Sequence, residues 1–87
     1  MSSLPESAHG VVRRRQVQAE TGLSRSTLYR LCADGLFTQP VRLGHRIVGW
    51  PWSEVSQINQ ARIAGQDHAA LRALVVALHG QRMQPGA

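Results

Sequence analysis

The sequence predicts a mainly α-helical domain with one small β-hairpin and an additional helix near the C-terminus. Three observations lead to this prediction. Two short helical patterns meet at Gly22, which favours a tight turn between helices. Two β-prone runs flank Gly44, and apolar residues recur at helical spacing over the last quarter of the chain. We expect the chain to divide into a flexible tail over residues 1–11, a folded domain over 12–65, a C-terminal helix over 66–82 and a second flexible tail over 83–87.

Length and charge restrict the functions that are expected. With 87 residues, of which 43% are apolar, the chain can form one small domain with little core to spare, so an elaborate active-site cleft is not expected. The formal net charge is +5 and is concentrated, because seven arginines from Arg13 to Arg46 face only two acidic residues. A concentrated positive field favours a polyanionic partner, and nucleic acid is the most common one for a basic domain. The alternative is a solvated basic face.

Other function classes lack their usual sequence signals. No apolar run reaches the roughly 20 residues that span a bilayer, and the N-terminal residues lack the pattern of a signal peptide, so we expect a cytoplasmic protein without membrane contact. Cys32 is the only cysteine and the four histidines show no short paired spacing, so we expect no metal site and no cofactor. Ser24, Ser26 and Tyr29 have no histidine and carboxylate in a supporting arrangement, so we expect no enzyme activity.

The first two expected helices form a helix-turn-helix pattern. Residues 13–21 are compatible with a helix that stops at Gly22. Ser24 can cap a second helix that begins at the next residue, because its hydroxyl can accept a hydrogen bond from a free backbone N–H of the first turn. Leu23 and Leu28 then occupy the two positions of a hydrophobic staple, which fixes where the second helix begins.

A β-hairpin is expected after the second helix. Residues 41–43 and 46–50 are short β-prone runs, and Gly44 and His45 lie between them, which suits a tight hairpin. Pro40 directly precedes the first run, where an edge strand tolerates the missing N–H donor. A hairpin that follows a helix-turn-helix is a wing, so the predicted fold is a winged helix-turn-helix with a C-terminal helix.

Two further helices are expected after the hairpin. The third should begin at Pro51 or Trp52, because proline suits the first helical turn. Its apolar stripe, which would close the core over the first two helices, consists of Trp52, Val55, Ile58 and Ile63. Asp67 can cap a fourth helix, with Gly80 and then Pro85-Gly86 as its stop signals. The apolar positions of this helix repeat at i, i+3, i+4 and i+7 and are Leu71, Leu74, Val75 and Leu78.

The second helix is the strongest candidate for nucleic-acid recognition. Leu28 and Leu31 would anchor one side of it, and the other side is polar. The DNA major groove accepts one α-helix, arginine can donate a bidentate pair to guanine, and hydroxyl groups can reach phosphates or base edges. The alternative is a solvated helix face with Tyr29 over the edge of the core. The candidate DNA-contacting residues are Arg25, Ser26, Tyr29 and Arg30.

Two smaller basic groups flank this helix in the sequence. Arg42, His45 and Arg46 lie about the hairpin tip, which could reach the minor groove or the flanking backbone. We favour Arg46 over His45, because a histidine in a turn is usually only a surface residue. The arginine run 13–15, at or before the start of the first helix, could hold phosphate, with Arg14 and Arg15 as the favoured contacts. The alternative is a solvated N-terminal arm.

The stretch TGLSRSTLYRLCADGLF…PVRLGHRIVGWPWSEVSQI, residues 21–58, resembles the AlpA-like family of prophage regulators, within the wider group of MerR-like winged-helix excisionases. The resemblance implies a protein that binds double-stranded DNA without a cofactor. It implies either transcriptional regulation of mobile-element genes or an excisionase role, in which bent DNA allows an integrase to excise the element. It places the recognition helix on Ser24–Leu31, which adds Thr27 to the DNA-facing residues, and the wing on Arg42–Arg46. The WPWSEV segment departs from the family pattern, and the residues after Gly65 lie outside it.

Two roles are open for the apolar face of the fourth helix. One winged module contacts few base pairs, and two copies that read two half-sites gain affinity, so we expect this face to form the seam of a homodimer. The alternative is that the face folds back onto the third helix. A function of a different class is a protein-interaction adaptor, in which this face binds an integrase or a repressor and the fold no longer reads DNA.

Overall fold

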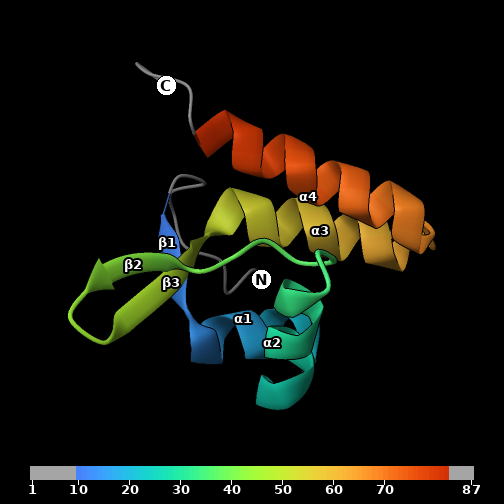
Figure 1. The fold of residues 1–87 in the computed structure, drawn as a ribbon. Coiled ribbons are helices and arrows are strands. Elements are labelled where there is room, and N and C mark those ends of the chain that lie inside the picture. Colours follow the sequence, from blue (N-terminus) through green and yellow to red (C-terminus); the bar gives the residue numbers. More distant parts are fainter. Residues whose placement is uncertain (1–9, 83–87) are drawn as a thin grey trace.

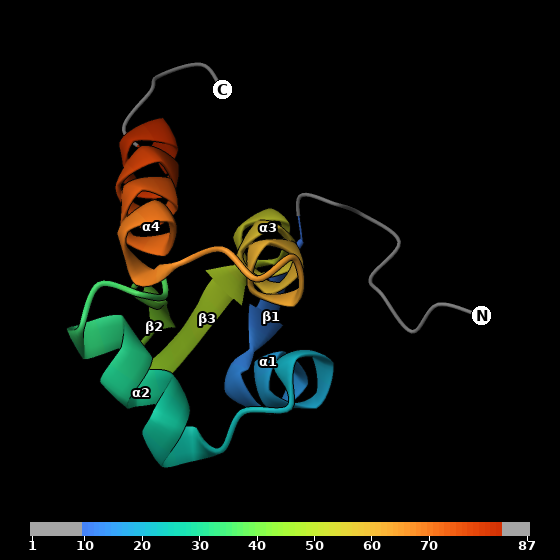
Figure 2. The same ribbon diagram turned by 90° about the vertical axis from the view of Figure 1, so that its right-hand side faces the viewer.

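The computed structural model describes residues 10–82 (Figure 1). The elements follow the order β1 (Val11–Arg13), α1 (Arg14–Thr21), α2 (Arg25–Ala33), β2 (Val41–Gly44), β3 (Ile47–Pro51), α3 (Trp52–Ile63) and α4 (His68–Arg82). This mainly α-helical fold with a small sheet confirms the predicted class and is compatible with a winged helix-turn-helix followed by a C-terminal helix. The α1–α2 pair and the α3–α4 pair lie on opposite sides of the molecule (Figure 1, Figure 2). The tails expected over 1–9 and 83–87 lie outside the described residues.

The turn between α1 and α2 forms as the sequence predicts. Gly22 ends α1 in the left-handed conformation, with φ 76°, and its N–H donates to a carbonyl of the preceding turn at 2.8 Å. Ser24 caps α2, because its Oγ accepts from the backbone N–H of Thr27 at 3.2 Å. Leu23 packs against the core cluster that contains the fully buried Leu28. The expected beginning of the second helix is therefore confirmed, with Leu23 placed as a hydrophobic staple requires.

A third strand, β1, completes an antiparallel sheet of order β1-β3-β2, where only a hairpin was expected. Val12 of β1 lies opposite Trp50 and is 6% exposed. The carbonyl of Gly10 accepts from the N–H of Trp52 at 2.7 Å. Gly10 and Val11, assigned to a tail from the sequence, therefore belong to the folded part of the chain. A three-residue strand has too short a pattern to read, and its pairing partner is distant in the sequence.

The hairpin turn lies one residue later than expected. β2 extends through Gly44, which pairs with Ile47, so His45 and Arg46 form the turn. Arg46 has a positive φ of 68°, and among residues 10–82 it is the only residue other than glycine with a positive φ. β2 is an edge strand, which fits Pro40 at its start.

Trp50 joins the wing to the core. It follows the hairpin turn on β3 and is fully buried. Its ring meets Phe37 edge-on, with 6.5 Å between ring centroids, and its Nε1 donates to the carbonyl of Thr38 at 2.8 Å. The Sγ of Cys32 donates to the same carbonyl at 3.4 Å, and burial raises the pKa of this thiol from its usual 9.0 to about 11. The end of α2, the connection to β2 and the sheet thus share one packed centre.

Helix α4 folds back onto the rest of the chain, and this corrects the expected dimer seam. Leu71, Val75 and Leu78 are only 4%, 3% and 1% exposed. Leu74 is half-buried against the same core. Val75 and Leu78 belong to the core cluster that contains Ile58, and Leu71 packs in a second cluster with Leu36 and Ala61. Folding back onto the chain and pairing with a second copy require the same periodicity, so the sequence fits both. Because the apolar face of α4 is buried, it is also not accessible to the partner that the adaptor hypothesis requires.

Helices α3 and α4 differ from expectation in two further details. Ile63 is 79% exposed, and Ala61 takes its place in the core at 7%. Ile63 follows Ile58 by five residues, so its side chain points about 140° away from the apolar stripe around the helix axis. Ala61 follows Ile58 by three residues, so its side chain lies close to the stripe. Asp67 caps α4 as expected, through a hydrogen bond of 2.8 Å from a backbone N–H of the first turn. The helix then continues through Gly80, the first of its two expected stop signals, to Arg82.

Within residues 10–82, no helix combines the length and the apolar character needed to cross a membrane. The same part of the chain contains no group of three or more histidine, cysteine, aspartate or glutamate side chains that could hold a metal ion.

Candidate nucleic-acid interface

Helix α2 presents a polar outer face. Its inner face is buried through Leu28 and Cys32. The side chains predicted to contact DNA lie on exposed residues of this helix, namely Arg25, Ser26, Tyr29 and Arg30. Tyr29 also packs on the core, with its ring centroid 6.0 Å from that of Trp50, and the residue is 36% exposed. The core therefore orients Tyr29 while part of it remains on the surface.

Thr27 has a structural role at the beginning of α2. Its Oγ1 accepts a hydrogen bond from the Oγ of Ser24 at 2.9 Å, and its backbone N–H donates to the same Oγ. The side chain that the family resemblance places among the DNA contacts is thus engaged in the helix cap. It stabilises the end of α2 that carries Arg25 and Ser26.

A concave surface, here called the basic concavity, lies between the start of α1, the first half of α2 and the wing. Its volume is about 500 Å³. Five of its seven lining residues are arginines, and none is acidic. The lining residues are Arg13, Arg14, Arg15, Arg25, Tyr29, Arg46 and Val48.

Local backbone structure brings these arginines together. Arg13 ends β1 and occupies the N-cap position of α1, so the arginine run passes from a strand into a helix. Because β1 pairs with β3, this run is placed beside the wing. Arg25 opens α2, and Arg46 lies in the hairpin turn. Arg14 is held further by a hydrogen bond of 2.8 Å from its Nη1 to the Oε1 of Gln18.

The basic concavity has no internal counter-charge in the part of the chain that the structure describes. The one ion pair between side chains of residues 10–82 joins Arg82 to Glu54, so none of the five arginines pairs with a carboxylate there. Like charges held at short range repel one another, and the repulsion grows where water is partly excluded. An anion in the concavity would offset this repulsion, and a polyanion would be attracted to it from solution.

The basic concavity brings together half of the residues predicted to contact DNA, namely Arg14, Arg15, Arg25, Tyr29 and Arg46. Other predicted contacts lie outside its lining. Ser26 and Arg30 extend the exposed face of α2, and His45 is exposed in the hairpin turn. Arg42 is exposed on β2 opposite Val48, so it continues the basic surface along the wing.

One lining residue, Val48, was not among the predicted contacts. Arg13 belongs to the arginine run that was expected to hold phosphate, but its place in the concavity depends on β1, which the sequence pattern does not reveal. Val48 follows Arg46 by two residues, and the strand expected over 46–50 would place both on one face, because alternate residues of a strand share a face. This alternation was the available signal for Val48.

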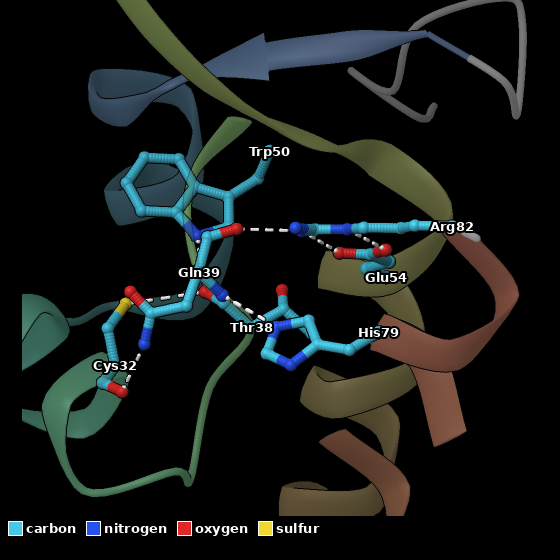
Figure 3. A network of polar contacts seen from close by, with 7 residues as sticks. All are labelled: Cys32, Thr38, Gln39, Trp50, Glu54, His79 and Arg82. Atoms are coloured by element: carbon cyan, nitrogen blue, oxygen red, sulfur yellow. Dashed lines mark hydrogen bonds and ion pairs between the residues drawn. The ribbon is translucent and has the colours of Figure 1, made fainter. Parts of the chain in front are cut away.

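The C-terminal end of α4 fastens the connection between α2 and β2 (Figure 3). The guanidinium of Arg82 contacts Glu54 at 2.6 and 2.8 Å, and its Nη2 donates to the carbonyl of Gln39 at 2.7 Å. The backbone N–H of Gln39 donates to the Nε2 of His79 at 3.0 Å. The side-chain Nε2 of Gln39 donates to the carbonyl of Cys32 at 2.6 Å. Helix α4 thus holds the segment that leads from α2 to the wing.

Two comparisons with known proteins agree with this architecture. A family model described as prophage CP4-57 regulatory protein (AlpA) matches residues 10–63, which contain β1 to α3 and the whole basic concavity. An uncharacterized protein, ORF88 of Enterobacteria phage P4, is 49% identical over 45 residues, which is 52% of this chain and 51% of that protein. The chain therefore matches about half the length of this relative, and no solved structure matches the chain. Because the family model covers more than half of its residues, the chain belongs to the family of AlpA-type prophage regulatory proteins.

Proposed function

We propose that this protein binds double-stranded DNA in a sequence-specific manner and regulates genes of a mobile genetic element. The observation that carries the proposal is the junction between the exposed polar face of α2 and the basic concavity. The first surface offers groups that can read base edges, and the second offers charge that can hold the phosphate backbone. Membership of a family of prophage regulatory proteins supports the regulatory role.

In the proposed complex, α2 lies in the major groove. An α-helix fits this groove, and an arginine can donate two parallel hydrogen bonds to O6 and N7 of guanine. Arg30 is the arginine that we assign to this role, because it is exposed on α2 and does not line the basic concavity. Arg25 lies on both surfaces, so it can contact a base or a phosphate. Ser26 lies beside Arg25 and can donate to or accept from a base edge.

An excisionase role is the second form of the proposal, and an exposed apolar patch on the sheet favours it. Val11, Leu43 and Ile47 are between 39% and 45% exposed. Val11 and Leu43 share one face of the sheet, because a Cβ at Gly49 would lie within 2.9 Å of both side chains. Exposed apolar patches often mark protein contacts, and an excisionase must act together with an integrase.

Selection of a binding sequence from a random duplex library tests the DNA-binding proposal. We expect the selected duplex to bind at least about 10³-fold more tightly than random duplex at the same salt concentration. Equal affinities would refute sequence specificity, and binding to neither duplex would refute DNA binding. A reporter gene downstream of the selected sequence then tests regulation. Excision by an integrase, with Leu43→Ser as the variant and Ile63→Ser as an exposed apolar control, tests the second form.

A further inference from the structure

The basic concavity unites arginines from three separate elements around one space. From this arrangement we infer that the basic concavity binds the phosphates of one strand of the DNA duplex. The wing arginine Arg46 contacts that backbone and does not enter the minor groove. The inference rests on the proposed DNA binding and deepens it. It assigns a shared ligand, the phosphodiester backbone, to the start of α1 and to the wing.

The position of Arg46 is the first step of the argument. A wing residue that enters a minor groove must extend away from the recognition helix. Arg46 instead lines the same space as Arg25 and Tyr29 of α2. His45, its neighbour in the turn, is exposed and does not line that space. The wing therefore turns its arginine toward α2 and leaves histidine at its tip.

The chemistry of the lining is the second step. Arginine presents planar N–H donors that match the oxygens of a phosphate and can bind it in a bidentate way. Five arginines with no carboxylate partner in the described chain exceed what one small anion needs, so a ligand with several charges along its length is favoured. Among the lining residues only Val48 is purely apolar, which disfavours a small apolar effector.

The beginning of α1 supplies a third, supporting observation. Its N-cap residue, Arg13, makes no side-chain hydrogen bond to the helix, and the first turn contains no acidic residue. The first backbone N–H groups of α1 therefore have no cap from this side chain and can add to the field of the arginines beside them. A phosphate held by Arg14 and Arg15 would lie near this positive end.

Salt dependence of binding to a short random-sequence duplex provides the test. Removal of one arginine that neutralises a phosphate should reduce the slope of log affinity against log salt concentration by about 0.9. We expect this reduction for Arg15→Gln and for Arg46→Gln separately. Arg62→Gln is the matched control, because it removes the same charge from an exposed residue outside the concavity, and it should leave the slope unchanged. Thermal melting of each variant verifies that the fold is intact.

A minor-groove ligand separates the two possible positions of the wing. On an A·T-rich duplex, netropsin fills the minor groove and leaves the phosphates accessible. We expect the effect of Arg46→Gln to be the same with and without netropsin. Competition by netropsin that weakens the wild type but not Arg46→Gln would overturn the inference, as would unchanged salt slopes for Arg15→Gln and Arg46→Gln. Failure of the wild-type protein to bind any duplex would instead refute the proposed function itself, together with this inference.

Discussion

The left-handed backbone at Arg46 allows its conformational cost to be separated from its charge. A residue with a Cβ in this region costs about 1–2 kcal/mol relative to glycine. Glycine in turn has more freedom in the unfolded chain, which offsets about 0.4–1 kcal/mol of that gain. Arg46 is exposed and its φ is 68°, so few packing interactions enter the comparison. We therefore expect Arg46→Gly to be more stable than Arg46→Ala by about 1 kcal/mol.

Thermal unfolding followed by circular dichroism measures this difference. For a domain of this size, about 1 kcal/mol corresponds to a difference of roughly 4–8 °C in Tm. Both variants lack the guanidinium, so both should bind random duplex equally weakly, and their salt slopes should agree. An Arg46→Ala variant as stable as Arg46→Gly would refute the conformational cost. Wild-type affinity in Arg46→Gly would refute the contact between the Arg46 guanidinium and the DNA backbone.

Four other predictions have defined outcomes. Arg30→Ala should weaken binding of the selected duplex by about 1–3 kcal/mol if Arg30 reads guanine, whereas an equal weakening on random duplex would assign it to phosphate. Arg82→Gln leaves the buried carboxylate of Glu54 without its ion pair, so urea unfolding should show a loss of about 2–4 kcal/mol, slightly reduced because the Arg82 side chain is 25% exposed. A loss below about 1 kcal/mol would contradict this. Because burial raises the pKa of Cys32 to about 11, the unfolded thiol ionises first and the free energy of unfolding should fall from pH 9 to 11. Cys32→Ala should remove that part of the fall, and an unchanged pH profile would count against it. Light scattering should find a monomer in the absence of DNA, since the apolar face of α4 is buried within the chain; a dimer would argue for another association surface.

Local signals in the sequence were sufficient for the helix-turn-helix. The cap at Ser24 and the position of Leu23 depend only on residues within one turn of the helix, so the beginning of α2 could be placed correctly. Contacts between distant segments could not be read in this way. Val12 is in a strand because it lies opposite Trp50, and nothing in the short run around it indicates that partner. Leu78 has the same spacing whether it meets its own core or a second chain.

The candidate site shows the same division between local and distant information. The exposed face of α2 follows from helical periodicity, which separates Arg30 from the buried Leu28. The basic concavity follows from β1 pairing with β3, which no local pattern encodes. The identity of its arginines was therefore accessible from the sequence, but their common space was not. The turn position of Arg46 was missed because Gly44 offered the more usual turn residue.

The pairing of Glu54 with Arg82 also bears on how the chain matures during synthesis. Glu54 lies in the first turn of α3, and its partner follows 28 residues later in the last turn of α4. Until residue 82 has left the ribosome, this carboxylate lacks its guanidinium and the apolar cluster lacks the cover of α4. The segment that matches the family model, residues 10–63, is synthesised well before Arg82 and the end of α4. We therefore expect nascent chains to become resistant to protease only after α4 has emerged from the ribosome.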